Sequence, residues 1–176
     1  MRRIGITGGI GSGKSVVSRL LRIMGYSVYD TDSEAKRLME SSLEVVQKLS
    51  ECFGRDIYHN GRLNRGLLSS RVFGESDKIV LLNSIVHPVV RFDFYRWSES
   101  LNEEICFVES AILYESRFDE LVDEVWTVTA PEELRIGRVR QRSGLTEEEI
   151  KKRMAAQLSE EEKQRRAAHI IWNDGN

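Results

Sequence analysis

Five short apolar runs punctuate the chain, and each is bounded by charged or turn-forming residues. The runs are Arg3–Thr7, Tyr26–Tyr29, Ile105–Val108, Val125–Val128 and Ile170–Trp172. Runs that are apolar on both faces are typical of parallel strands that helices cover on both sides. Helical patterns separate the runs, so the sequence predicts an α/β protein with right-handed crossovers.

The interval between the second and third runs is long and contains no good strand. From Ser33 to Leu101 it shows helical patterns instead, and Pro88 is expected at a first helical position. The patterns are Glu34–Met39, Leu43–Phe53, Leu67–Val72, Lys78–Val86 and Val89–Ser98. Because this interval is too long for a plain crossover helix, we expect a helical subdomain that holds a second substrate.

A second helical insertion is predicted before the last apolar run. Pro131 suits the first turn of a helix, and Gly144 is expected to end it. Two later pairs have the spacing of capping boxes, Thr146 with Glu149 and Ser159 with Glu162. We expect these hairpin-like helices to form a mobile lid.

The residues Gly8–Ser15 fit the phosphate-binding pattern G-x-x-x-x-G-K-[ST] without a mismatch. They lie between a predicted strand and a predicted helix, where backbone N–H groups and the helix N-terminus attract phosphate. Lys14 is expected to reach the β- and γ-phosphates of a nucleotide, and the Ser15 hydroxyl to join the shell of Mg²⁺. The alternatives are a glycine-rich turn without a ligand and a loop that binds nucleotide only for regulation.

The sequence Asp30-Thr31-Asp32 ends the second apolar run. The carboxyl ends of parallel strands form the ligand crevice, so one of these aspartates could accept the proton of an attacking hydroxyl. The alternative is that Asp32 caps a helix that begins near Ser33. The spacing alone does not separate these two interpretations.

Three arginines, Arg135, Arg138 and Arg142, fall on one face of the helix predicted after Pro131. Guanidinium groups suit phosphate oxygens, so Arg138 and Arg142 are expected to swing over ATP. Such a row of arginines on a helix is more often just a face exposed to solvent. A phosphate-binding loop in the same chain makes that interpretation less favoured here.

Other candidate residues stand near the ends of predicted elements. Glu109 follows the third apolar run and is expected to hold Mg²⁺ through water, with a solvated strand end as the alternative. Glu115 could face the second substrate or a lid arginine, but an ordinary surface role is favoured. His87 could hydrogen-bond a substrate hydroxyl or phosphate, or simply pack at a helix start.

The composition of the 176-residue chain narrows the class of protein. Hydrophobic residues make up 40%, charged residues 31%, and the net charge of −2 does not suggest a nucleic-acid partner. Cys52 and Cys106 stand far apart, which argues against a disulfide scaffold. With no apolar run of membrane-spanning length, we expect a cytoplasmic monomer or small homo-oligomer without a membrane partner.

Taken together, these motifs resemble those of the dephospho-CoA kinase family nearly from end to end. The order of the aspartate pair, the Asn-Gly and Leu-Asn-Arg stretch and the His-Pro pair is what makes the resemblance specific. The matching residues are Ile6–Ser15, Val28–Asp32, Phe53-Gly54, Asn60–Arg65, Val72-Phe73, Leu82–Pro88, Ile112–Glu115, Arg138, Gln141-Arg142, Gln157 and Asn173–Gly175. The chain departs from the family pattern at Ala111, Ala168-His169 and Trp172.

The resemblance implies a P-loop kinase core with a five-stranded parallel sheet, a helical substrate-binding insertion and a lid. The core would comprise residues 1–32, 102–130 and 164–176, the dephospho-CoA-binding insertion residues 33–101, and the lid residues 131–163. The implied reaction uses ATP and Mg²⁺ to phosphorylate the ribose 3′-hydroxyl of dephospho-CoA, giving coenzyme A and ADP.

The resemblance also assigns roles to residues. Asp32, Lys14 and Arg138 would be catalytic. ATP would be held by Gly8, Gly9, Ile10, Gly11, Ser12, Gly13, Lys14, Ser15, Val16, Arg142 and Asn173. The acceptor would meet Thr7, Asp32, Asn64, Arg65, His87 and Glu115, and the metal Ser15 and, through water, Glu109.

Two rival functions stay open from the residues alone. One is another small P-loop kinase that acts on a nucleotide, nucleoside or sugar acid. The other is a GTPase-like switch or an ATP-sensing module, although the sequence contains no Asn-Lys-x-Asp motif for reading guanine.

Overall fold

A computed structural model of the protein describes residues 1–72 and 74–175, so Phe73 of the Val72-Phe73 motif lies outside the described residues. The chain forms two compact units. One contains Met1–Asp30 and the chain from Ser98 onward, and the other contains Thr31–Trp97. We describe each unit by itself.

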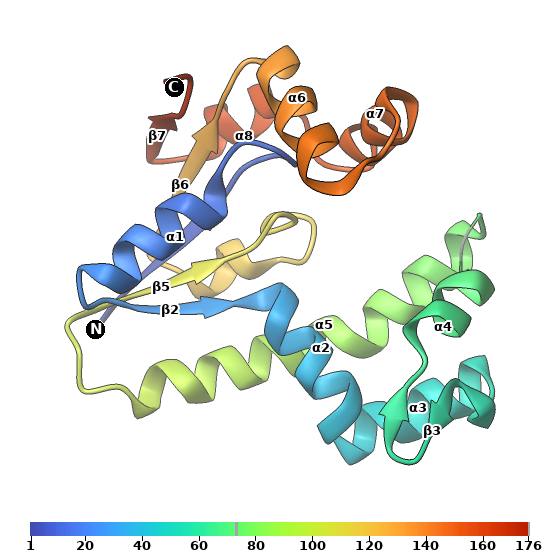
Figure 1. The fold of residues 1–176 in the computed structure, drawn as a ribbon. Helices are drawn as coiled ribbons and strands as arrows, with labels where there is room; N and C mark the ends of the chain where they lie inside the picture. Colours follow the sequence, from blue (N-terminus) through green and yellow to red (C-terminus); the bar gives the residue numbers. More distant parts are fainter. Residues whose placement is uncertain (73, 176) are drawn as a thin grey trace. The chain divides into compact units, whose positions relative to one another are not determined.

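The first unit is built on a five-stranded sheet in which every pair of neighbouring strands is parallel (Figure 1). The strand order is β2-β5-β1-β6-β7, so the expected α/β class with a five-stranded parallel sheet is confirmed. The strands are β1 (Arg2–Thr7), β2 (Ser27–Asp30), β5 (Ile105–Glu109), β6 (Glu124–Thr129) and β7 (His169–Trp172).

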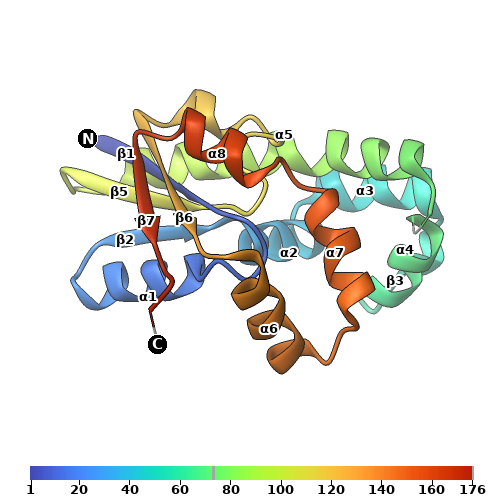
Figure 2. The same cartoon turned by 90° about the horizontal axis from the view of Figure 1, so that it is seen from above.

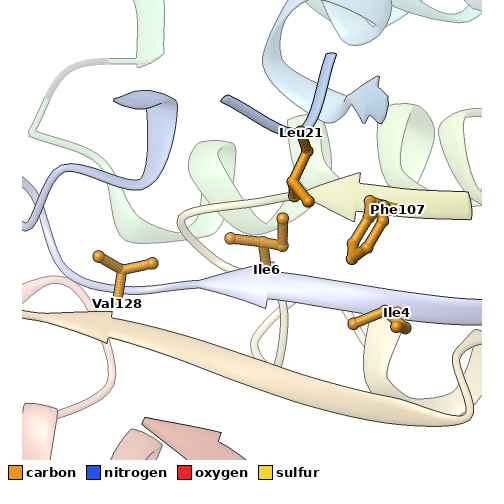
Figure 3. Close-up of a cluster of buried hydrophobic side chains, with 5 residues drawn as sticks. All are labelled: Ile4, Ile6, Leu21, Phe107 and Val128. Carbon is orange, nitrogen blue, oxygen red and sulfur yellow. The ribbon is translucent and has the colours of Figure 1, made fainter. Parts of the chain in front are cut away.

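The centre of this sheet is apolar on both faces, as its sequence runs predicted. A buried cluster joins β1, β5 and β6 to the helix α1 (Lys14–Ile23), which follows the first strand. Its members, drawn in Figure 3, are Ile4, Ile6, Leu21, Phe107 and Val128. Burying such side chains contributes about 1.5–3 kcal/mol each, which fixes the strands whose ends carry the candidate site.

Helices cover the sheet on both sides, with α1 on one face and α8 (Glu160–Arg166) on the other (Figure 2). The turn η2 (Phe118–Leu121) lies between β5 and β6. Among residues 1–72 and 74–175, no helix combines the length and apolar character that crossing a membrane requires.

Between β6 and α8 lie α6 (Glu132–Ser143) and α7 (Glu147–Ala155), within the predicted lid segment. They share a small core of Ile136, Val139 and Ile150. Two of the predicted helix ends are confirmed: Gly144 closes α6, and Thr146 with Glu149 forms a complete capping box. Pro131, expected in the first turn, is instead the N-cap residue directly before α6. At α8, the Ser159 hydroxyl accepts a hydrogen bond from the Glu162 N–H at 3.2 Å.

The second unit is mainly helical. Its elements are α2 (Thr31–Ser41), α3 (Leu43–Phe53), η1 (Arg55–Ile57), β3 (Tyr58–His59), β4 (Arg62–Leu63), α4 (Arg65–Val72) and most of α5 (Ser76–Ser100). The expectation that this interval holds no strand was wrong, because β3 and β4 pair in an antiparallel hairpin. Strands of two residues are too short to show the alternation of apolar and polar residues that predicts a strand. The sequence feature that could have predicted this hairpin is the turn-forming pair Asn60-Gly61.

A second correction concerns Pro88, which the sequence placed at the start of a separate helix. In the structure α5 runs without interruption from Ser76 to Ser100, with Pro88 inside it. An internal proline costs about 3 kcal/mol because it removes a hydrogen bond and crowds the preceding turn. Burial of Ile85, Val86, Val90 and Phe94 along α5 outweighs this cost at about 1.5–3 kcal/mol per side chain.

Candidate nucleotide and acceptor sites

The glycine loop joins the carboxyl end of β1 to the amino end of α1, as the sequence predicted. The Ser12 N–H donates to the Gly9 carbonyl oxygen at 3.1 Å and closes a tight turn. Gly13 then adopts a left-handed conformation, with φ of 96°, immediately before the helix begins at Lys14. Since Gly13 carries no side chain to cap α1, the first N–H groups of this helix suit a bound anion.

Asn173 braces this loop from beyond the last strand. Its side-chain Nδ2 donates to the Ser12 carbonyl oxygen at 2.9 Å, and its backbone N–H donates to the Thr129 carbonyl oxygen at 2.8 Å. A Cβ on Gly13 would overlap the Asn173 amide. The structure therefore places Asn173, which the resemblance assigned to nucleotide binding, against the backbone of the phosphate-binding loop.

The two expected metal-binding residues come together at the end of the sheet. The Ser15 hydroxyl donates to Glu109 Oε1 at 3.0 Å, and the Glu109 side chain is buried at the carboxyl end of β5. Hydroxyl and carboxylate oxygens are ligands that Mg²⁺ accepts. Within the described residues, no group of three or more histidine, cysteine and carboxylate side chains could hold a metal. The pair fits a Mg²⁺ ion that Ser15 would bind directly and Glu109 through water, with phosphate oxygens and water as the other ligands.

The arginine stripe on α6 divides into three environments. Arg135 is buried, and its Nη1 lies 2.9 Å from Glu160 Oε1. Arg138 is half-buried, and its buried Nη1 has no hydrogen-bond partner among residues 1–72 and 74–175. Arg142 is exposed. Arg135 Nε is likewise buried without a hydrogen-bond partner in the described part of the chain. Arg138 differs from Arg135 in that no ion pair engages its guanidinium within the described residues, so it has donors to offer an anion.

The loop also contacts the predicted lid segment through Ile10. The Ile10 N–H donates to Gln157 Oε1 at 3.0 Å, and its side chain packs against the core shared by α6 and α7. Glu115, an expected acceptor residue, accepts a hydrogen bond from the Leu158 N–H at 2.7 Å. Thr7, at the end of β1, is buried, and its hydroxyl has no hydrogen-bond partner in the described part of the chain.

Four of the expected acceptor residues belong to the second unit. Asp32 lies exposed in the first turn of α2, which begins at Thr31, so Asp32 is not the N-cap of that helix. Asn64 Oδ1 accepts a hydrogen bond from the Leu67 N–H at 3.0 Å and so caps α4. Arg65 Nη2 lies 3.1 Å from Glu40 Oε1.

His87 is the fourth of these residues and is half-buried on α5. Burial, and then the positive charge of Arg91, lowers the pKa of the His87 imidazole below its ordinary value of 6.5. A neutral imidazole can both donate and accept a hydrogen bond, which suits contact with a hydroxyl.

Sequence reasoning missed two residues next to the loop, Glu160 and Lys163. Both lie on α8, where Glu160 accepts a hydrogen bond from the Thr129 hydroxyl at 3.1 Å and Lys163 is fully buried. The charged stretch Glu160–Arg166 has the composition of a solvated helix, so the sequence offered no signal that two of its charges point inward.

Known proteins resemble this chain over nearly its whole length. A family model described as dephospho-CoA kinase matches residues 2–176. The dephospho-CoA kinase of Porphyromonas gingivalis is 44% identical over 174 residues, which cover 98% of this chain and 86% of that protein. That of Corynebacterium diphtheriae is 40% identical, with 100% of this chain and 90% of that protein covered.

Solved structures agree with the sequence comparison. A Thermus thermophilus protein superposes with a TM-score of 0.86 at 38% identity, covering 99% of this chain and 90% of its own. Dephospho-CoA kinase from Campylobacter jejuni gives a TM-score of 0.74 at 25% identity, covering 100% and 90%. Shikimate kinase from Acinetobacter baumannii, at 16% identity, covers 100% and 86% with a TM-score of 0.58, and shares the fold alone.

Proposed function

Because this chain belongs to the dephospho-CoA kinase family, we propose that it transfers the terminal phosphoryl group of ATP to the ribose 3′-hydroxyl of dephospho-CoA. The products are coenzyme A and ADP. The observation that carries this proposal is the match to the family model over residues 2–176. The rival of another small P-loop kinase is not favoured, since the shikimate kinase from Acinetobacter baumannii is similar to this chain in fold alone.

In this proposal the glycine loop holds the triphosphate. The backbone from Gly8 to Val16 binds the phosphate oxygens, and Lys14 neutralises charge on the β- and γ-phosphates. Ser15 and, through water, Glu109 hold Mg²⁺, which supplies further charge neutralisation to the phosphates when it is bound. Their hydrogen bond of 3.0 Å supports this assignment. Asn173 acts on the nucleotide through the loop backbone that it braces.

The acceptor side depends on Asp32 in this proposal. Its carboxylate orients the 3′-hydroxyl and accepts the proton, at a late stage because the transition state of phosphoryl transfer is loose. Thr7, Asn64, Arg65, His87 and Glu115 are assigned to acceptor binding. The exposure of Asp32 in the first turn of α2 supports its availability to a substrate.

We assign the lid role to residues 131–163. Arg138 is expected to stabilise the charge of the migrating phosphoryl group, with Arg142 nearby for ATP. The buried Arg138 Nη1, which lacks a partner within the described residues, supports this choice over a purely solvated stripe. Closure of the lid would exclude water and limit wasteful ATP hydrolysis. An Arg138→Ala protein with unchanged kinetics would refute the assignment.

We also propose that the reaction takes place in the cytoplasm, in a monomer or small homo-oligomer. The two cysteines, Cys52 and Cys106, are unpaired, as is usual for proteins of reducing compartments.

The test is a coupled assay of ADP release with and without dephospho-CoA. We expect ATP turnover to depend on the acceptor, and ³¹P NMR to show a new phosphomonoester on the ribose 3′ oxygen. A parallel panel with a nucleoside, a nucleotide and shikimate should remain near the background rate. Transfer to one of these acceptors in preference to dephospho-CoA would contradict the proposal, and transfer to none would indicate an ATP-binding module.

A further inference from the structure

A lysine of α8 lies inside the protein, close to the phosphate-binding loop. The Lys163 side chain is fully buried, and its Nζ lies 4.0 Å from Glu160 Oε1. In the part of the chain that the structure describes, Nζ has no hydrogen-bond partner. Burying an ammonium group costs several kcal/mol unless opposite charges compensate for its lost hydration. Packing alone therefore does not explain why a lysine occupies this buried position.

Glu160, which faces this lysine, uses both of its carboxylate oxygens. Glu160 Oε1 lies 2.9 Å from Arg135 Nη1, and Oε2 accepts a hydrogen bond from the Thr129 hydroxyl at 3.1 Å. Thr129 in turn accepts a hydrogen bond from Gln164 Nε2 at 3.2 Å. The carboxylate therefore ties α6 and α8 to the end of β6.

The Arg135–Glu160 ion pair lies directly against the glycine loop. A Cβ on Gly9 would overlap both Arg135 Nη1 and Glu160 Oε1. A Cβ on Gly11 would come within 2.5 Å of the Arg135 carbonyl oxygen. Because this backbone is the part of the loop expected to hold phosphate, a shift of the ion pair would alter the shape of the nucleotide site.

The charges around Lys163 extend to the loop itself. Burial lowers the pKa of the Lys163 ammonium group, and the positive charges of Lys14 and Arg135 lower it further. Glu115 and Glu160 oppose this effect by favouring the charged form. The buried lysine is thus placed among the charges that face the phosphate-binding loop.

The ion pair also borders a cavity. Arg135 and Glu160, together with Gln157, help to line a cavity of about 180 Å³. On the side that faces this cavity, packed neighbours do not hold the ion pair in place. The ammonium group of Lys163 is an opposite charge that can hold the Glu160 carboxylate there.

We propose that Lys163 is a positioning residue of the nucleotide site, whose ammonium group holds Glu160 where it fixes Arg135 against Gly9 and Gly11. The inference rests on the ATP site of the proposed function. Its test uses ATP binding in the absence of acceptor, so a wrong acceptor assignment would leave the result unaffected.

The test compares the Kd of ATP, measured by competition with a fluorescent nucleotide, in Lys163→Met and Lys163→Arg proteins. We expect Lys163→Met to raise the Kd about tenfold and Lys163→Arg to stay within about threefold, because only methionine removes the charge. The KM for ATP should rise in Lys163→Met as well. Lys151→Met, at an exposed lysine of α7, makes the same change in net charge and should leave both constants unchanged.

A double-mutant cycle with Glu160→Gln tests the path through the carboxylate. Glu160→Gln alone should weaken ATP binding, and adding Lys163→Met should cost less than it does in the original protein. Additive effects would overturn the proposal, since Lys163 would then act independently of Glu160. An unchanged Kd in Lys163→Met with a lowered Tm would also overturn it, leaving a merely structural role. If Lys163→Met does not fold, an unchanged Kd in Glu160→Gln is sufficient to overturn the proposal.

Discussion

Most of the expected nucleotide site lies in consecutive residues, Gly8–Val16, where one strand leads into one helix, with Arg142 and Asn173 as the distant members. The expected acceptor site, by contrast, is dispersed. In the helical unit its candidates are Asp32, Asn64, Arg65 and His87, which lie on or next to α2, α4 and α5. Backbone N–H groups at one strand-to-helix turn bind phosphate, so the first site is local in sequence. An acceptor as large as dephospho-CoA needs contacts from several helices, so the acceptor site is not local in sequence. Substitutions in the two regions should therefore fail in different ways.

The largest effect is expected at Lys14 in the glycine loop. Lys14→Met should lower kcat by about 10²–10³-fold and weaken ATP binding, because it removes a preorganised cation from the developing phosphate charge. Steady-state kinetics and direct ATP titration measure the two effects. Lys48→Met, on the exposed face of α3, is the control and should change neither quantity. A Lys14→Met protein that binds and turns over ATP normally would contradict the assigned role.

Asp32 tests the acceptor side of the comparison. Asp32→Asn should lower kcat by about 10²-fold or more while the Kd of ATP stays unchanged, because only the proton acceptor is lost. Asp30→Asn, two residues earlier at the end of β2, is the matched control and should cost less. Near-normal kcat in Asp32→Asn, or a larger loss in Asp30→Asn, would remove Asp32 from the catalytic role.

Substitution of two glycines should have opposite effects in the glycine loop and on the surface of α6. Gly11 has a φ of 81° and lies against the Arg135 backbone, so Gly11→Ala should lower the free energy of unfolding by about 1–3 kcal/mol. Gly137 lies in α6, where an added Cβ would meet no described atom within 4 Å. Gly137→Ala should raise the free energy of unfolding by about 0.5–1 kcal/mol. Urea unfolding measures both, and equal effects would contradict the close contact at Gly11.

The smallest effect is expected from His87 in the helical unit, where it concerns how the free energy of unfolding depends on pH. Its pKa is lowered in the folded protein by burial and by Arg91, so the unfolded chain binds the proton first as the pH falls below 6.5. The free energy of unfolding should then decrease toward lower pH, by at most about 1.4 kcal/mol per pH unit for one proton.

Urea unfolding at several pH values, compared between the original protein and His87→Gln, isolates this contribution. The variant should lose less stability on acidification, and His59→Gln, at an exposed histidine of β3, should behave like the original protein. Parallel pH profiles of the original protein and His87→Gln would show that His87 does not contribute.

The sequence by itself determined those features of the fold that depend on residues close to one another along the chain. Five apolar runs predicted five strands, the spacing Gly8–Ser15 predicted the turn between β1 and α1, and Thr146 with Glu149 predicted a helix start. In each case the deciding interactions are backbone conformation and contacts within a few residues, which local sequence specifies. Ser15 and Glu109 became candidates for metal binding because each stands at the end of its own element, and the structure brings the two side chains into hydrogen-bond contact.

Tertiary structure alone decided the rest. Pro88 stays inside α5 because distant apolar partners outweigh the local cost of proline, and no local pattern reports that balance. Asn173 braces Ser12 across 161 positions of sequence, and Lys163 turns inward from a helix with a solvated composition. Burial and long-range hydrogen bonds arise only when elements pack together, so the charges that support the loop could be recognised only in the folded protein.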